Sequence, residues 1–303
     1  MPDSSAIQDS GAVEIPTRTL VESMIRQDST IDAGELYAVA NTLGMTDQQV
    51  RLCIKRLVAE GQFTHEGRGR KAVLYATDRT RGALEPDIEF LRYMYRQDRG
   101  VEPWDGQWRL AAFGIPETAR QARDAMRDTI IRLGGAPIQG GLYVSANPWE
   151  DRIATAAAEL GVTEHLTLLS TTDLLIGGAR TPRALAERLW PLDRLAAGHI
   201  RLLEVAQRVL RTLRAATPPT PTQRLTLQIE LGTEFARALD PDPLLPPELL
   251  PRPWIGAQAR AAVAACWAEL ARTETPNATR VFQWYYDVTA EVLREQPAST
   301  RGR

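Results

Sequence analysis

The chain has few of the residues that stabilise small secreted folds or bind metals. Cys53 and Cys266 are its only cysteines, too few for a disulfide framework. Its only histidines, His65, His165 and His199, are too far apart in sequence for the spacing of a metal site. No apolar run reaches the roughly 18 residues of a membrane span, and the N-terminus lacks a signal-peptide pattern. We therefore expect a cytosolic protein without membrane contact.

Lysine is almost absent, since Lys55 and Lys71 are the only two among 36 basic residues. The net charge of -2 gives the whole molecule no attraction to nucleic acid. Between residues 47 and 81, however, eight basic residues face four acidic ones, so this window carries +4 and the rest of the chain -6. Any nucleic-acid binding must therefore come from this local patch.

The first part of the chain has the pattern of three short helices. Apolar residues at helical spacing follow Pro16. Asp32 is expected to cap a second helix, with Glu35 at the reciprocal capping position and Gly44 ending the helix. Only Gly44 and Met45 separate it from the next start, which is typical of a helix-turn-helix.

The third helix is expected to begin at Thr46, which forms a capping-box pattern with Gln49, and to close at Gly61. Its apolar face has members at i, i+3, i+4 and i+7: Val50, Cys53, Ile54 and Leu57. The remaining surface is basic and rich in amides, as a DNA-reading helix requires, because arginine pairs with guanine and glutamine with adenine.

The stretch GQFTHEGRGRKAVLYAT predicts a β-hairpin with strands at 62–65 and 72–76 and a turn at 67–70. Its basic tip is typical of the wing of a winged helix, where glycines permit close approach to DNA and cations displace counterions. We predict DNA contacts from Thr46, Gln48, Gln49, Arg51, Lys55, Arg56, Arg68, Arg70 and Lys71. The alternatives are a solvated hairpin tip and a winged helix that binds a protein partner.

Residues 104–177 predict a second unit with the order β-α-β-β-α-β, which indicates a ferredoxin-like domain. The expected strands are 108–115, a short one at Ile138, 142–145 and 165–170, and the expected helices are 117–133 and 148–160. Residues 83–103 are expected to connect it to the first unit, with a short helical pattern at 90–95. The polar residues 1–14 are expected to be disordered.

Residues 178–296 predict a helical end domain that serves ligand binding or dimerisation. Helices are expected at 182–213, 223–239, 255–273 and 279–295. Four tryptophans lie in this domain: Trp190, Trp254, Trp267 and Trp284. Their spacing favours positions in the core, and the alternative is that they line a ligand pocket or a dimer interface. The fold class is therefore α+β and multidomain, with a winged helix-turn-helix at 16–82, a ferredoxin-like middle domain and an all-α C-terminal domain.

Four segments, in order along almost the whole chain, resemble the PaaX-type family of winged-helix transcriptional regulators: RLVAEGQFTHEGRGRKAVLYAT, WDGQWRLAAFGIPETARQARDAMRDTIIRLGGAPIQGGLYVS, LAERLWPLDRLA and LDPDPLLPPELLPRPW. The resemblance implies a homodimeric repressor that is released from DNA by a small effector, an aryl-acetyl-coenzyme A thioester in the archetype. It places the DNA-reading helix at 46–60 and the wing around 68–71. Two recognition helices in a two-fold dimer would lie in successive major grooves, so the operator should be palindromic.

The resemblance also implies a middle domain similar to a small CRISPR-associated nuclease fold. This chain has Gly114 where the family has an aspartate, and Gly134-Gly135-Ala136 where it has Gly-Phe-Gly. The nuclease interpretation therefore loses its metal-binding carboxylate. We find no nucleophile motif and no paired carboxylates, so we expect no enzyme activity, no cofactor and no metal. Candidate effector contacts are Trp108, Arg109, Arg188 and Trp190.

Overall fold

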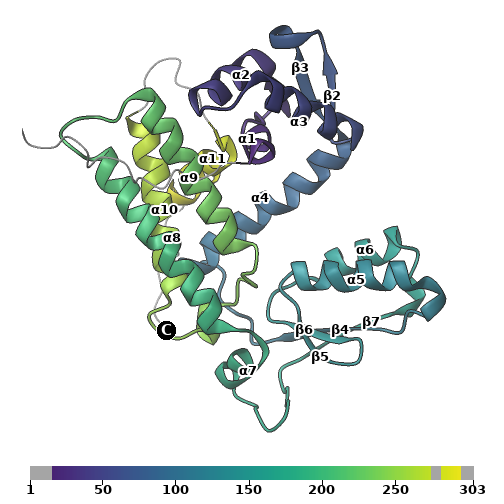
Figure 1. Ribbon diagram of the computed structural model, residues 1–303. Coiled ribbons are helices and arrows are strands. Elements are labelled where there is room, and N and C mark those ends of the chain that lie inside the picture. The colour runs from purple at the N-terminus through teal and green to yellow at the C-terminus, as the bar shows by residue number, and fades with distance from the viewer. Residues whose placement is uncertain (1–15, 274–280, 295–303) are drawn as a thin grey trace, which may run out of the picture.

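A computed structural model describes residues 16–273 and 281–294 of the chain. The expectation for residues 1–14 and the predicted start of the last helix at 279 lie outside these ranges. Helices are combined with two small antiparallel sheets, which agrees with the predicted α+β class. Figure 1 shows a small unit with one sheet at the top, a second sheet with two helices at the lower right and a bundle of long helices at the left.

The N-terminal unit contains three helices and a three-stranded sheet. The helices are α1 (Thr17–Ser23), α2 (Ala33–Thr42) and α3 (Asp47–Ala59). The strands β1 (Thr30–Asp32), β2 (Phe63–Glu66) and β3 (Val73–Ala76) pair in the order β1-β3-β2. Strand β1 was not predicted, because three residues are too few to show an alternating pattern. A single 3-10 turn, η1 (Gly69–Lys71), forms the hairpin tip.

Two caps define the starts of α2 and α3. The carboxylate of Asp32 accepts a hydrogen bond from the Glu35 backbone N–H at 2.8 Å, as predicted. The reciprocal position is not used as expected, because the Glu35 carboxylate pairs instead with Arg26 at 2.7 Å. The capping box between Thr46 and Gln49 is confirmed.

Helix α4 (Asp78–Asp98) is far longer than the short helical pattern predicted for the connecting segment. Its 21 residues span about 30 Å at 1.5 Å per residue. It follows strand β3 directly, and the hydroxyls of Thr77 and Thr80 tie its start to the carbonyl of Gln62 at 3.2 and 2.7 Å. The helix therefore forms a rod that leads from the N-terminal sheet to the rest of the molecule (Figure 1).

The middle unit has the predicted β-α-β-β-α-β order. Its strands β4 (Trp108–Phe113), β5 (Ala136–Gln139), β6 (Leu142–Ser145) and β7 (Leu166–Thr171) form an antiparallel sheet in the order β5-β6-β4-β7. Helices α5 (Arg120–Arg132) and α6 (Glu150–Glu159) cover one face of it (Figure 1). Two 3-10 turns, η2 (Glu117–Ala119) and η3 (Thr163–His165), precede α5 and β7.

The C-terminal part is helical, with a break that its apolar periodicity does not predict. It comprises α7 (Pro182–Leu189), α8 (Leu192–Leu213), α9 (Pro221–Leu239), the turn η4 (Pro247–Leu249), α10 (Ile255–Arg272) and α11 (Gln283–Arg294). The single helix predicted for 182–213 is wrong. Trp190 is extended, with φ -123° and ψ 145°, because a residue before proline is disfavoured in helical backbone.

The helical bundle contributes to the core of the N-terminal unit. Leu225 and Ile229 of α9, together with Val281, belong to the same buried apolar cluster as Leu20 and Leu36. The backbone N–H of Phe282 donates to the Ser23 carbonyl at 2.6 Å. The N-terminal unit is therefore packed against α9 and the segment before α11.

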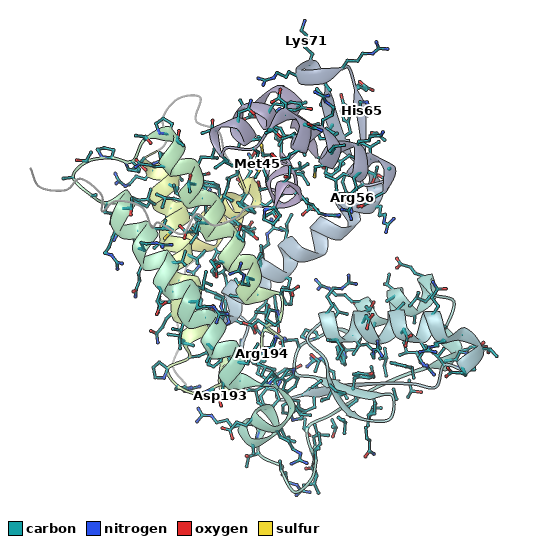
Figure 2. The ribbon with its side chains drawn as sticks, in the orientation of Figure 1. Met45, Arg56, His65, Lys71, Asp193 and Arg194 are labelled. Carbon is teal, nitrogen blue, oxygen red and sulfur yellow. The ribbon has the colours of Figure 1, made fainter. Side chains whose placement is uncertain are left out.

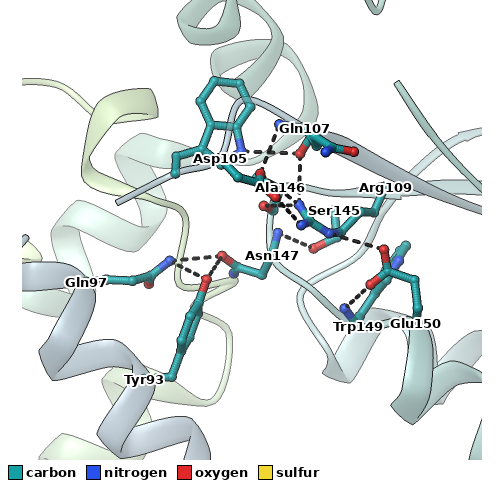
Figure 3. Close-up of polar contacts among 11 residues, drawn as sticks. Tyr93, Gln97, Asp105, Gln107, Arg109, Ser145, Ala146, Asn147, Trp149 and Glu150 are labelled. Carbon is teal, nitrogen blue, oxygen red and sulfur yellow. Dashed lines mark hydrogen bonds and ion pairs between the residues drawn. The ribbon is translucent and has the colours of Figure 1, made fainter. Parts of the chain in front are cut away.

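One buried amide joins three segments of the chain, and Figure 3 shows its contacts with helix α4. Asn147, which follows β6, accepts hydrogen bonds through Oδ1 from the Tyr93 hydroxyl at 3.1 Å and from Gln97 Nε2 at 3.0 Å, both on α4. Its Nδ2 donates to the carbonyls of Pro243 at 3.0 Å and Leu244 at 2.8 Å. All four hydrogen-bonding positions of the amide are therefore used.

A buried charged cluster lies beside this amide. Arg260 of α10 makes two hydrogen bonds to Asp98 at the end of α4, at 2.6 and 2.7 Å. It also contacts Asp242 at 3.2 Å, and Asp242 contacts His199 of α8 at 2.7 Å. The cluster thus fixes the C-terminal end of α4 to the helical bundle. No helix in the described ranges is long and apolar enough to cross a lipid bilayer.

Candidate nucleic-acid interface

Helix α3 separates a buried apolar face from an exposed polar one. Val50 is fully buried and Leu57 is 1% exposed, whereas Cys53 and Ile54 are half-buried against the same core. The outward face carries five of the predicted DNA-contacting residues, all exposed: Gln48, Gln49, Arg51, Lys55 and Arg56. The side chains predicted from helical spacing therefore lie together on the free surface of one helix.

The capping box limits the hydrogen bonds that Thr46 and Gln49 can make to DNA. The Oε1 atom of Gln49 accepts from the Thr46 backbone N–H at 2.8 Å and from its hydroxyl at 2.9 Å. The Thr46 hydroxyl in turn accepts from the Gln49 backbone N–H at 3.3 Å. An amide that reads adenine needs both its oxygen and its NH₂ group, and the oxygen of Gln49 already serves the cap. Gln48, Arg51 and Lys55 are the freer side chains on this face.

Arg56 lies at the far end of the outward face and is paired. Its Nε atom lies 2.8 Å from Glu60, which also contacts Arg18 of α1 at 3.0 Å. Hydrogen bonding by Arg56, with a further contribution from Arg18, lowers the pKa of the Glu60 carboxyl. The Arg56 side chain is nevertheless 77% exposed, so the pair leaves it accessible. Figure 2 shows Arg56 at the end of the N-terminal unit away from Lys71.

The hairpin tip packs against the helices instead of standing free. Arg70 lies over the Tyr37 ring of α2, 5.6 Å from its centroid, and contacts Asp47 at the start of α3 at 3.2 Å. A side chain on Gly34 of α2 would come within 2.8 Å of the Arg70 carbonyl, so this close approach requires glycine. Hydrogen bonding by Arg70 lowers the pKa of the Asp47 carboxyl.

Arg68 and Lys71 are the free cations of the tip. Both are exposed, and neither has a side-chain hydrogen bond or ion pair with another described residue. Lys71 projects from the end of the tip (Figure 2). Gly67 has a φ of +83°, and an added side chain would come within 2.9 Å of the Lys71 carbonyl. Glycine at this position is therefore required by the turn itself.

Three residues of this surface were missed from sequence. Tyr37 and Asp47 hold Arg70 in place, and no local pattern indicates a contact between residues so far apart along the chain. Leu52 was also missed, although it lies 59% exposed on the outward face of α3. A leucine at a polar position of the helical pattern was the signal that could have revealed it.

Two of the four predicted effector contacts, Trp108 and Trp190, belong to one buried apolar cluster. Trp108 is 1% exposed and stacks on Trp190, with ring centroids 6.4 Å apart. The indole N–H of Trp190 donates to the Gly134 carbonyl at 3.1 Å. Arg109 is bound to Asp105 and Glu150, whereas Arg188 is exposed on α7. These residues line neither the pocket beside Trp267 nor the one beside Tyr143.

Gly114 stands at the strand end where the family has an aspartate, and it is exposed. Gly114 follows β4 and donates its N–H to the His165 carbonyl at 3.0 Å. In the described ranges, no three His, Cys, Asp or Glu side chains gather in a way that could hold a metal ion.

Two family models match the chain. The model described as the PaaX protein central Cas2-like domain matches residues 101–186. The model described as the PaaX-like protein C-terminal domain matches residues 190–280. The chain belongs to the PaaX family.

A curated member of the PaaX family shares 26% identity over 240 residues, which cover 79% of this chain and 74% of that protein: Transcriptional repressor PaaX of Escherichia coli (strain K12). The solved structure of an uncharacterised protein, Rv0674 of Mycobacterium tuberculosis, is 23% identical, with a TM-score of 0.48. That match covers 84% of this chain and 96% of the other. The boundary between the two PaaX models falls at residues 187–189, at the end of α7 and just before its break from α8.

Proposed function

We propose that this PaaX-family protein is a DNA-binding transcriptional regulator whose N-terminal unit is a winged helix-turn-helix. Helix α3 would enter the major groove, and the tip between β2 and β3 would contact the backbone or minor groove. The order of three helices and a three-stranded sheet supports this assignment. The relative named as a transcriptional repressor supports repression. Such a role would place the protein in the cytoplasm.

The observation that carries the proposal is the concentration of free cations on one surface. Arg51, Lys55, Arg68 and Lys71 are exposed and form no side-chain hydrogen bond or ion pair with another described residue. They lie on α3 and on the tip that packs beside its first turn through Arg70. Each such cation that reaches a phosphate displaces counterions and strengthens binding at low salt.

The middle unit and the helical part have proposed roles as well. The β5-β6-β4-β7 sheet with two helices on one face supports a ferredoxin-like assignment for residues 104–177. We assign ligand binding or dimerisation to residues 178–296. Two copies of α3 about 34 Å apart would read a palindromic operator. An effector, for which an aryl-acyl-coenzyme A thioester is our candidate, would release DNA only by its differential affinity for two dimer geometries.

A binding titration tests this function. Purified protein would be titrated against DNA from upstream of its own gene and its neighbours, at two salt concentrations, with and without acyl-coenzyme A thioesters. We expect tight, salt-sensitive binding at one palindrome that one thioester weakens. Binding no tighter than to random DNA at either salt would reject a DNA-binding role. It would favour the alternative of a winged helix that binds a protein partner.

A metal-dependent nuclease is the less favoured alternative. The observation that favours a nuclease is that the family model matching residues 101–186 is described as Cas2-like. Gly114 has no side chain to supply the carboxylate that a metal-dependent nuclease would need at this strand end. Hydrolysis of DNA by the purified protein, abolished by a chelator, would support the nuclease over the regulator.

A further inference from the structure

The outward face of α3 contains an apolar side chain among cations and amides. Leu52 is 59% exposed, the highest value among the large exposed hydrophobic side chains of the described chain. It lies about 200° around the helix from the buried Val50, because successive residues turn by about 100°. Leu52 therefore makes no contribution to the core that holds α3 in place.

The neighbours of Leu52 suggest what it contacts. Residues three and four positions away share its helical face: Gln48, Gln49, Lys55 and Arg56, all of them exposed. A partner that covers this face must therefore present hydrogen-bonding groups and negative charge around a small apolar group. The other large exposed hydrophobic residues, such as Leu175 at 58%, lie outside the N-terminal helices.

The major groove of DNA offers this combination. Its base edges carry donors and acceptors, its rims carry phosphates, and its one apolar group is the 5-methyl of thymine. The position along α3 is also suitable, since Leu52 is the sixth residue of the helix and the N-terminal half of a recognition helix faces the bases. A protein partner with an acidic rim is the competing occupant, and it would not depend on a thymine methyl.

We propose that Leu52 is a specificity-determining residue that contacts the 5-methyl group of a thymine in each operator half-site. The inference rests on the proposed DNA-binding function and makes it more specific. Burying one methyl group is worth about a fourfold change in affinity. A dimer that makes the contact twice would gain about fifteenfold.

Replacement of thymine by uracil isolates this contact, because it removes the methyl group and leaves every hydrogen-bonding group unchanged. The full-length protein would first select its preferred duplex from a random pool. Its affinity would then be measured for that duplex made with thymidine and with deoxyuridine. We expect the wild type to bind the uracil duplex about fifteenfold less tightly, and Leu52→Ala to bind both duplexes equally.

Three controls make the result decisive. Leu52→Met keeps an apolar side chain and should retain sensitivity to uracil. Leu175→Ala removes the same atoms from an equally exposed leucine outside α3 and should behave as wild type. Equal thermal midpoints for Leu52→Ala and wild type would confirm an intact fold, as expected for an exposed position.

Two outcomes would overturn the proposal, and they differ from each other. If wild type and Leu52→Ala lose the same affinity on uracil substitution, or if the selected site contains no thymine, then Leu52 does not read the methyl group while DNA binding itself stands. If the wild type selects no duplex from the pool, the proposed DNA-binding function fails together with this inference.

Discussion

The amide nitrogen of Asn147 lies 2.8 Å from the carbonyl oxygen of Leu244, a residue of the helical part with a φ of +48°. A positive φ is uncommon for leucine and is stabilised only by its surroundings. The Leu244 N–H donates to the Asp242 carboxylate at 2.9 Å, so both polar groups of this residue are held. The strained loop, the middle unit and α4 therefore meet at one buried amide.

Asn147→Leu should destabilise the protein by more than a typical core substitution. The change leaves the Tyr93 hydroxyl hydrogen and two carbonyls without partners, while Gln97 keeps only its hydrogen bond to the Tyr93 hydroxyl. Each buried group left unsatisfied costs about 1–3 kcal/mol. We expect a loss of at least about 3 kcal/mol in the free energy of unfolding, measured by chemical denaturation. Gln121→Leu, the same kind of change at an exposed site in the middle unit, should stay within about 0.5 kcal/mol. Similar losses for both variants would contradict a special role for Asn147.

Asp242→Asn should be destabilising near neutral pH. The substitution removes one of the two carboxylates that neutralise the buried Arg260. Since Asp98 remains, the loss should fall toward the lower end of the about 3–5 kcal/mol that breaking a buried pair costs. Asp240→Asn, a nearby exposed position, is the matched control. Unfolding midpoints that do not distinguish the two variants would show that Asp98 alone suffices for Arg260.

The same variant has an expected pH dependence. Burial by itself raises the pKa of Asp242, but the hydrogen bond from His199 and the charge of Arg260 outweigh burial and hold that pKa below its usual value. A depressed pKa in the folded state means that the stabilisation is present above the unfolded pKa of about 3.9 and is lost as pH falls through the folded value. The stability difference between wild type and Asp242→Asn should be constant from pH 7 to about pH 5 and narrow below about pH 4. A difference that widens in acid would have the wrong sign.

Local patterns predicted the parts of the fold that depend on neighbouring residues. The capping box at Thr46, the apolar face of α3 and the β-α-β-β-α-β order all follow from spacings of a few residues. The break at Trp190 was also encoded locally, by Pro191, but the leucine periodicity on both sides concealed it. Strand β1 escaped because its partner β3 lies more than forty residues away and gives it no pattern of its own.

Contacts between distant segments explain what the sequence left open at the candidate interface. The basic residues of α3 and of the tip could be named, but not which of them are free. Arg70 is held by Asp47, 23 residues away, whereas Arg68 is not, and both look alike in the sequence. The charge pattern alone therefore overestimated the number of free cations at this surface.

Asp47→Asn tests whether that pairing restrains DNA binding. The change removes a negative charge beside α3 and frees Arg70, so we expect tighter binding to operator and random DNA alike. The slope of log affinity against log salt should become steeper by about one, the amount expected for one further phosphate contact. Asp128→Asn makes the same change in net charge on the exposed face of α5 and should leave the slope unaltered. An unchanged slope for both variants would mean that Arg70 does not reach a phosphate.

Thr46 caps α3 and also lies at the candidate interface. A second, equivalent capping box elsewhere in the chain allows these two roles to be tested separately. Thr46 caps α3 with Gln49, and Thr220 caps α9 with Gln223, each with the same pair of reciprocal bonds. Replacing either threonine by alanine should cost about 1 kcal/mol in the free energy of unfolding, because each loses one cap. Only Thr46→Ala should alter DNA recognition, since it removes the hydroxyl contact to the Gln49 amide on the outward face of α3 and leaves that amide held by the backbone N–H alone. Selection of preferred duplexes by the two variants would measure this. If the site preferences of Thr220→Ala and Thr46→Ala differ equally from that of the wild type, the change arises from lost stability and not from Gln49.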